Sequence, residues 1–135
     1  MAESRILIVD DEPDIRLMLR LLLESQGYMV DEAADGLEAL ESLRTQHYGV
    51  MFLDLLMPNL GGKEVLERLP PELKDTMPVV VLTALNTDRD VLSGYRQGAT
   101  LYLTKPFSND NVIDTLNYLT TDLTESERLV LESRL

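Results

Sequence analysis

The chain has 135 residues, 44% of them hydrophobic and 27% charged, which is enough to build one globular domain around its own core. It contains no cysteine, which excludes disulfides, thiolate metal sites and a cysteine nucleophile. The formal net charge of -12 argues against non-specific binding to nucleic acid or to an anionic membrane surface, and favours cations and basic partners. No leader-like segment opens the chain and no apolar run approaches membrane-spanning length, so we expect a cytoplasmic protein without a membrane partner.

Short apolar runs alternate with amphipathic segments over the first 120 residues. The runs predict five strands, at residues 6–9, 29–33, 50–54, 79–83 and 100–104. Helical spacing of apolar residues predicts helices near residues 13–26, 37–47, 63–69, 88–97 and 109–119. Pro13 suits the first turn of a helix, Gly27 suits a helix end, and Pro70-Pro71 is expected to end the third helix before a polar connection.

Five strands alternating with five helices predict an α/β fold with a parallel sheet covered on both faces. Because crossovers are right-handed, few topologies remain, and we expect a doubly wound, flavodoxin-like (βα)5 sandwich with strand order 2-1-3-4-5. In that order the first and third strands are neighbours. Their carboxyl ends then meet at the switch point, where open sheets bind ligands.

Polar side chains stand at the ends of four of these strands. Asp10 and Asp11 follow the first strand, Asp54 ends the third, Thr83 ends the fourth, and Lys105 follows the fifth. Packed carboxylates repel one another unless a cation neutralises them, and all-oxygen ligands favour Mg²⁺. Asp54 could then act as a nucleophile towards phosphorus, with Thr83 and Lys105 holding the phosphoryl oxygens.

These motifs resemble the receiver domain of two-component response regulators, the CheY-like superfamily, over Ser4 to Leu119. The matching residues are Asp10-Asp11-Glu12, Asp54, Met57-Pro58, Gly61-Gly62, Thr83-Ala84, Gly98-Ala99 and Tyr102-Leu103-Thr104-Lys105-Pro106-Phe107. One acidic pair alone is a weak signal, whereas the whole ordered set is highly specific.

The resemblance implies a role for each residue of the acidic site. Asp54 matches the phosphoacceptor, which a histidine kinase, a phosphotransfer protein or a small phosphodonor would phosphorylate. Asp11 and Asp54 match direct Mg²⁺ ligands, the backbone carbonyl of Leu56 matches a third, and Asp10 would act mainly through water. Lys105 matches the lysine that binds the phosphoryl group.

The resemblance also implies how the signal leaves the site. Thr83 and Tyr102 match a switch pair that would change the surface of the fourth helix, fifth strand and fifth helix for a downstream effector or output domain. The bond before Pro106 is expected to be cis. Leu56 and Leu85 match the positions that flank the path of the hydrolytic water, and two apolar side chains there predict a long-lived phosphoaspartate.

Each residue type also has an ordinary structural role. Asp10, Asp11 and Thr83 could simply cap a helix or strand, and Tyr102 could be a half-buried sheet aromatic. We interpret Glu12 as an ordinary first-turn acid and His47 as a surface residue.

Two other functions compete with the switch. A hydrolase of the haloacid-dehalogenase kind uses an Asp-x-Asp motif, but this chain has Leu56 in the second position. A degenerate receiver that serves as a constitutive interaction module would not need the complete acidic, threonine and lysine set.

The tail, residues 121–135, is interpreted as an extension of the receiver domain over residues 1–120. Thr124 to Glu127 fits a capping box for a new short helix, while apolar spacing through Val130 would also continue the last helix as a dimerisation arm. Part of the tail resembles the first helix of LuxR-type DNA-binding domains. Because it ends before a recognition helix and carries no basic cluster, we expect no direct nucleic-acid binding.

Overall fold

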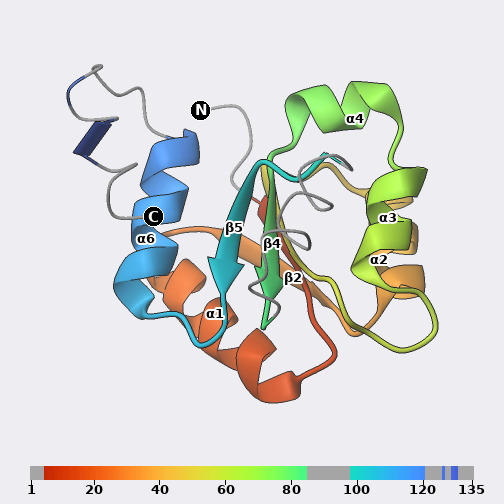
Figure 1. The fold of residues 1–135 in the computed structure, drawn as a ribbon, viewed down its shortest axis with the longest axis horizontal. Coiled ribbons are helices and arrows are strands. Elements are labelled where there is room, and N and C mark those ends of the chain that lie inside the picture. The colour runs from red at the N-terminus through yellow and green to blue at the C-terminus, as the bar shows by residue number, and fades with distance from the viewer. Residues whose placement is uncertain (1–4, 85–97, 121–125, 127–128, 131–135) are drawn as a thin grey trace.

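The computed structural model describes residues 5–84, 98–120, 126 and 129–130. The elements are β1 (Arg5–Val9), α1 (Pro13–Ser25), β2 (Met29–Ala33), α2 (Gly36–Thr45), β3 (Val50–Asp54), α3 (Gly62–Arg68), α4 (Pro71–Thr76), β4 (Val79–Thr83), β5 (Leu101–Thr104) and α6 (Asn109–Thr120). All strand pairs are parallel, in the order β2-β1-β3-β4-β5 (Figure 1). The predicted α/β fold and strand order are confirmed.

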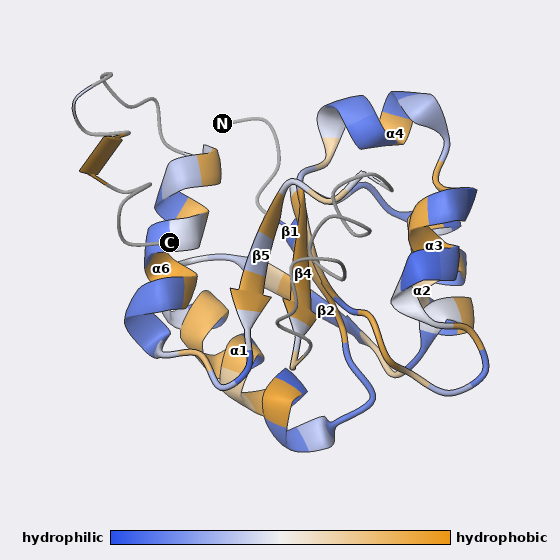
Figure 2. Cartoon of the chain, in the orientation of Figure 1, coloured by the Kyte–Doolittle hydropathy of each residue, from blue (hydrophilic) through white to orange (hydrophobic). Residues whose placement is uncertain are grey.

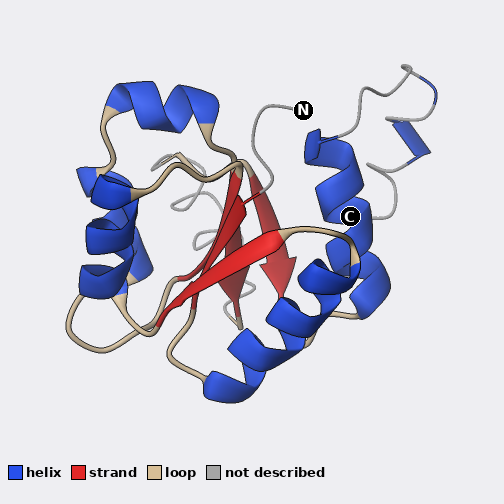
Figure 3. Ribbon diagram, turned by 180° about the vertical axis from the view of Figure 1, so that it is seen from behind, coloured by secondary structure: helices blue, strands red, loops and turns tan. Residues whose placement is uncertain are grey.

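Two hydrophobic cores lie on opposite faces of the sheet. Alternate side chains of a strand point to opposite faces, so Leu7 joins one core while Ile6 and Ile8 join the other. Helices α2 and α3 cover the first face, and α1 and α6 cover the second (Figures 1 and 3). The central strands β3 and β4 are buried at every residue, which explains why both are apolar up to their polar last residues, Asp54 and Thr83 (Figure 2).

Local signals place the helix ends that flank the site. Pro13 begins α1, where its missing N–H costs no hydrogen bond, and Gly27 follows the helix with a φ of 94°. Asp35 caps α2, because its Oδ1 accepts a hydrogen bond of 2.9 Å from the Glu38 N–H. The starts of α1 and α2 fix where two loops at the carboxyl edge of the sheet end, while Gly27 leads into β2 at the opposite, amino edge.

The segment before β4 differs from the predicted polar connection, because residues Pro71–Thr76 form the short helix α4. The two prolines do end α3, as predicted, but Pro71 also occupies the first turn of a helix, the position that proline tolerates best. The predicted helix over residues 88–97 lies outside the described residues, as does most of the tail. In the part that is described, no helix is long and apolar enough to cross a membrane.

Candidate functional site

Strand register brings the predicted site residues together at the carboxyl edge of the sheet. Val9 is level with Leu53 in the neighbouring strand, so Asp10 and Asp54 leave the sheet side by side. On the other side, Thr83 is level with Thr104, and the Lys105 N–H donates to the Thr83 carbonyl at 2.8 Å. Side chains from four strand ends therefore surround one point.

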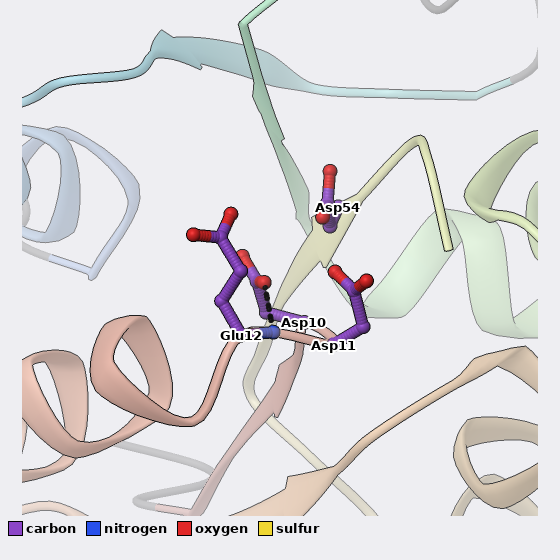
Figure 4. A group of neighbouring side chains, drawn as sticks. All are labelled: Asp10, Asp11, Glu12 and Asp54. Atoms are coloured by element: carbon purple, nitrogen blue, oxygen red, sulfur yellow. Dashed lines mark hydrogen bonds between the residues drawn. The ribbon is translucent and has the colours of Figure 1, made fainter. Parts of the chain in front are cut away.

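Four carboxylates meet there. Asp10, Asp11, Glu12 and Asp54 each offer an oxygen, and these oxygens all lie within 4.8 Å of one another (Figure 4). Asp10 and Asp54 are buried, while Asp11 and Glu12 are exposed at the mouth of the site. The prediction that Asp10, Asp11 and Asp54 converge is confirmed.

Glu12 is more than the ordinary first-turn acid that the sequence suggested. It is the N-cap residue of α1 without a capping hydrogen bond from its side chain, and its Oε1 lies 2.9 Å from the Lys105 ammonium. Its position directly after Asp10 and Asp11 was the available signal. Whether its longer side chain reaches back to Lys105 depends on the path of the chain from β1 into α1, which the sequence does not show.

Lys105 is the cation at the centre of this cluster. Its Nζ lies 2.8 Å from Asp10 Oδ2, 2.9 Å from Glu12 Oε1 and 3.4 Å from Asp54 Oδ2. Burial of the ammonium opposes its charge, but the contacts with Asp10 and Glu12 outweigh burial and raise the pKa of Lys105 above its ordinary value. One ammonium cannot neutralise four carboxylates, so the site keeps an excess of negative charge.

The chemistry of Asp54 reflects that excess. Burial of the carboxyl group, followed by repulsion from Asp10, raises the pKa of Asp54 from 3.8 to about 6, against the opposing effect of Lys105. The Leu56 N–H donates to Asp54 Oδ1 over a long 3.3 Å. An additional cation at this position would favour the ionised, nucleophilic form of Asp54.

Asp10 is held from several directions. Its N–H donates to the Ala33 carbonyl at 3.1 Å, its Oδ1 accepts from the Glu12 N–H at 2.9 Å, and its carbonyl accepts from Arg16 Nη1 at 2.6 Å. Its buried Oδ2 lies close to Lys105 but accepts no hydrogen bond of good geometry. A buried carboxylate oxygen with spare capacity, beside three further carboxylates, fits a hard divalent cation such as Mg²⁺ or its bound water. No sequence pattern indicated the Arg16 contact.

The remaining predicted residues lie around this centre. Thr83 is buried at the end of β4, and Tyr102 is half-buried in β5, where it packs against the core on the α2–α3 face. The Leu56 side chain is 61% exposed, while Leu85 lies outside the described residues. The bond between Lys105 and Pro106 is cis, as predicted, and His47 is exposed as predicted.

A cleft of about 530 Å³ opens on the Asp11 side of the cluster. Its wall is the loop that follows β3, and the lining residues include Leu56, Met57, Pro58 and Asn59. The acidic cluster is therefore reachable from solvent on this side.

The family model of the response regulator receiver domain matches residues 6–117. The transcriptional regulatory protein ResD of Bacillus subtilis is 38% identical over 111 residues, covering 82% of this chain and 45% of ResD. The probable transcriptional regulator ycf27 of Porphyridium aerugineum is 42% identical over 108 residues, covering 80% of this chain and 44% of that relative. The chain thus spans less than half the length of these relatives.

Solved structures agree with the sequence relatives. The chemotaxis protein CheY4 of Vibrio cholerae superimposes with a TM-score of 0.81 at 34% identity, covering 87% of this chain and 99% of CheY4. The response regulator TrrA of Thermotoga maritima, solved in complex with Mg²⁺-BeF, gives a TM-score of 0.76 at 36% identity, covering 86% of this chain and 98% of TrrA. The chain belongs to the response regulator receiver domain family of two-component systems.

Proposed function

We propose that this receiver domain is a Mg²⁺-dependent phosphoaspartate switch in which Asp54 accepts the phosphoryl group. The observation that carries the proposal is the convergence of four carboxylates on one lysine at the strand ends, with Asp54 buried beside Lys105. TrrA, which is similar to this chain, was solved with Mg²⁺ and a beryllium fluoride group, and this supports the same chemistry here.

Asp11, Asp54 and the Leu56 backbone carbonyl would hold the metal ion directly, with Asp10 acting through water. These are oxygen ligands throughout, which suits Mg²⁺. When bound, Mg²⁺ supplies positive charge that offsets the carboxylates and polarises a phosphoryl oxygen. Asp10 is already fixed through its backbone and Oδ1, so it would orient a metal-bound water without moving.

The donor is a phosphohistidine of a histidine kinase or phosphotransfer protein, or a small phosphodonor. An Asp54 oxygen attacks phosphorus and forms the new O–P bond. With phosphohistidine, the P–N bond to the imidazole breaks and the departing nitrogen keeps the bonding electrons; with acetyl phosphate, the P–O bond to the acetyl group breaks and acetate leaves with them. Lys105 already lies 3.4 Å from Asp54 Oδ2 and would contact the incoming phosphoryl oxygens. The Thr83 hydroxyl, at the end of the neighbouring strand, would bind another of these oxygens.

Movement of Thr83 towards the phosphoryl group would let Tyr102 turn inward. The two residues stand on the paired strands β4 and β5, so a movement of the Thr83 side chain would change the space available to the Tyr102 ring. The surface formed by the helix expected over residues 88–97, by β5 and by α6 would then change its preference for a downstream effector or output domain. Alternatively, the receiver domain, residues 1–120, would form a homodimer through that surface or through the tail, residues 121–135. We place this switch in the cytoplasm.

Hydrolysis of the phosphoaspartate would be slow. Leu56 and Leu85 flank the path of the attacking water in this family's arrangement, and an aliphatic side chain can neither orient that water nor bond to it. The exposed Leu56 side chain stands at the mouth of the site. The chain would therefore assist its own phosphorylation and slow dephosphorylation without acting as an enzyme on a separate substrate.

Incubation with acetyl phosphate tests the function. The switch requires stoichiometric, Mg²⁺-dependent modification that Asp54→Asn abolishes. Rapid multiple turnover of a small phosphoester would instead support a hydrolase, and no response to acetyl phosphate or beryllium fluoride would leave a constitutive interaction module.

A further inference from the structure

The loop between β3 and α3, Leu55 to Gly61, carries the Leu56 carbonyl that the proposed function assigns to the metal. A backbone carbonyl cannot adjust by side-chain rotation, so its direction is set by the conformation of the loop. The direct hydrogen bond between this loop and the acidic cluster is the long one from the Leu56 N–H to Asp54. Beside Leu56, the Leu55 carbonyl accepts from the Gly62 N–H at 3.0 Å, and further contacts hold the turn of the loop.

Those contacts come from the junction between β2 and α2. Asn59 Nδ2 donates to Asp35 Oδ2 at 2.8 Å, and the Gly36 N–H donates to the Leu60 carbonyl at 2.9 Å. We call the side-chain pair the Asp35–Asn59 clamp. A Cβ on Gly36 would lie 2.4 Å from the Leu60 oxygen, so the two loops approach as closely as a glycine permits.

The charge of Asp35 and the backbone conformation of Asn59 both favour this hydrogen bond. Asp35 uses one oxygen to cap α2 and the other to bind Asn59, and these hydrogen bonds lower the pKa of Asp35, which keeps the carboxylate ionised. Asn59 has a φ of 66°, the left-handed region that asparagine tolerates better than most residues. The clamp therefore joins a rigid helix end to the turn of the loop.

We propose that Asp35 and Asn59 are positioning residues that hold the Leu56 carbonyl in place for Mg²⁺. The inference rests on the proposed function and deepens it, because it makes metal affinity depend on a contact outside the acidic cluster. The clamp and the cleft wall share Asn59, so loss of the clamp would loosen the side of the site where Leu56 lies. A purely structural contact would contribute to folding and leave Mg²⁺ binding unchanged.

Two variants remove the clamp with little other change. Asn59→Gly loses the side-chain amide but keeps the left-handed backbone accessible. Asp35→Ser keeps an N-cap oxygen for α2, but its side chain is one atom shorter and lacks the second oxygen that binds Asn59. Glu38→Ala is the matched control, because Glu38 Oε1 accepts from the Ala34 N–H at 2.9 Å next to the clamp without touching Asn59.

Calorimetric titration with Mg²⁺, alongside thermal unfolding in chelator, tests the inference. We expect Asn59→Gly and Asp35→Ser each to weaken Mg²⁺ binding about three- to tenfold, the double variant to be no weaker than the singles, and Glu38→Ala to bind as the wild type does. If Asn59→Gly binds Mg²⁺ with wild-type affinity, or if Glu38→Ala weakens Mg²⁺ binding equally, the positioning role of the clamp is wrong while the proposed function still stands. A wild-type protein that binds no Mg²⁺ would overturn the proposed function as well.

Discussion

Replacing Asp54 by Asn should stabilise the metal-free protein at neutral pH. Asp54 is 5% exposed, and burial together with the Asp10 charge raises its pKa from 3.8 to about 6. At about 1.4 kcal/mol per pKa unit, this difference corresponds to about 3 kcal/mol that the ionised carboxylate costs the fold. Asparagine removes that charge and can still accept the Leu56 N–H, while Lys105 keeps Asp10 and Glu12 as partners.

The sign of the pH dependence follows from the raised pKa. Between pH 3.8 and about 6 the folded protein binds the Asp54 proton more tightly than the unfolded chain, so the free energy of unfolding falls as pH rises through this window. Below this pH window, Asp54 is protonated in both the folded and the unfolded state, so Asp54→Asn should not increase the free energy of unfolding. The stabilising effect of Asp54→Asn should therefore be absent near pH 3.5 and complete at pH 7.5.

Urea unfolding in chelator at several pH values measures this directly. The wild type and Asp54→Asn should differ by about 3 kcal/mol at pH 7.5, which is roughly 10 °C in melting temperature for a domain of this size. Saturating Mg²⁺ should narrow the gap, because the metal binds the wild-type site more tightly and adds about 2.7 kcal/mol at a hundredfold excess over its Kd. Equal stability of the two proteins at pH 7.5 in chelator would refute the claim that the buried, ionised Asp54 beside Asp10 destabilises the metal-free fold.

Three further variants probe separate parts of the molecule. Gly62→Ala should destabilise by at least about 2 kcal/mol in denaturant unfolding, because the new Cβ would lie 2.3 Å from the Asp54 carbonyl oxygen, and an unchanged midpoint would contradict that contact. Tyr48→Phe should cost about 1 to 2 kcal/mol by loss of the 2.6 Å hydrogen bond to Asp31. Burial, together with this bond, raises the pKa of Tyr48 to about 12, so alkaline titration should show a late-titrating phenol that this variant removes. Leu56→Asn combined with a polar residue at Leu85 should shorten the phosphoaspartate lifetime about tenfold or more in a decay assay, and an unchanged rate would rule out the leucines as its cause.

The sheet was predictable because its strands are short apolar runs that end at turn residues. Once the order 2-1-3-4-5 is accepted, topology alone brings Asp10 and Asp54 together, and the register of the strands confirms this. The cluster was therefore visible from the positions of strand ends. No side-chain detail was needed for it.

The features that sequence did not reveal depend on side-chain reach and loop path. Glu12 turns back to Lys105, and Arg16 reaches the Asp10 carbonyl across the first turn of α1. Asn59 meets Asp35 through a turn with positive φ that no periodicity marks. Helix α4 was missed because two prolines signal a helix end more clearly than a new start.

Site-specific phosphorylation in the presence of Mg²⁺ tests the central claim most directly. The protein, its Asp54→Asn variant and its Lys105→Ala variant are incubated with acetyl phosphate, with Mg²⁺ or with chelator, and the phosphoryl group is located by intact mass and peptide mapping. The account predicts one phosphoryl group on Asp54 of the wild type, formed only with Mg²⁺, absent in Asp54→Asn and strongly reduced in Lys105→Ala. Modification that persists in Asp54→Asn, or that forms equally well in chelator, would contradict it.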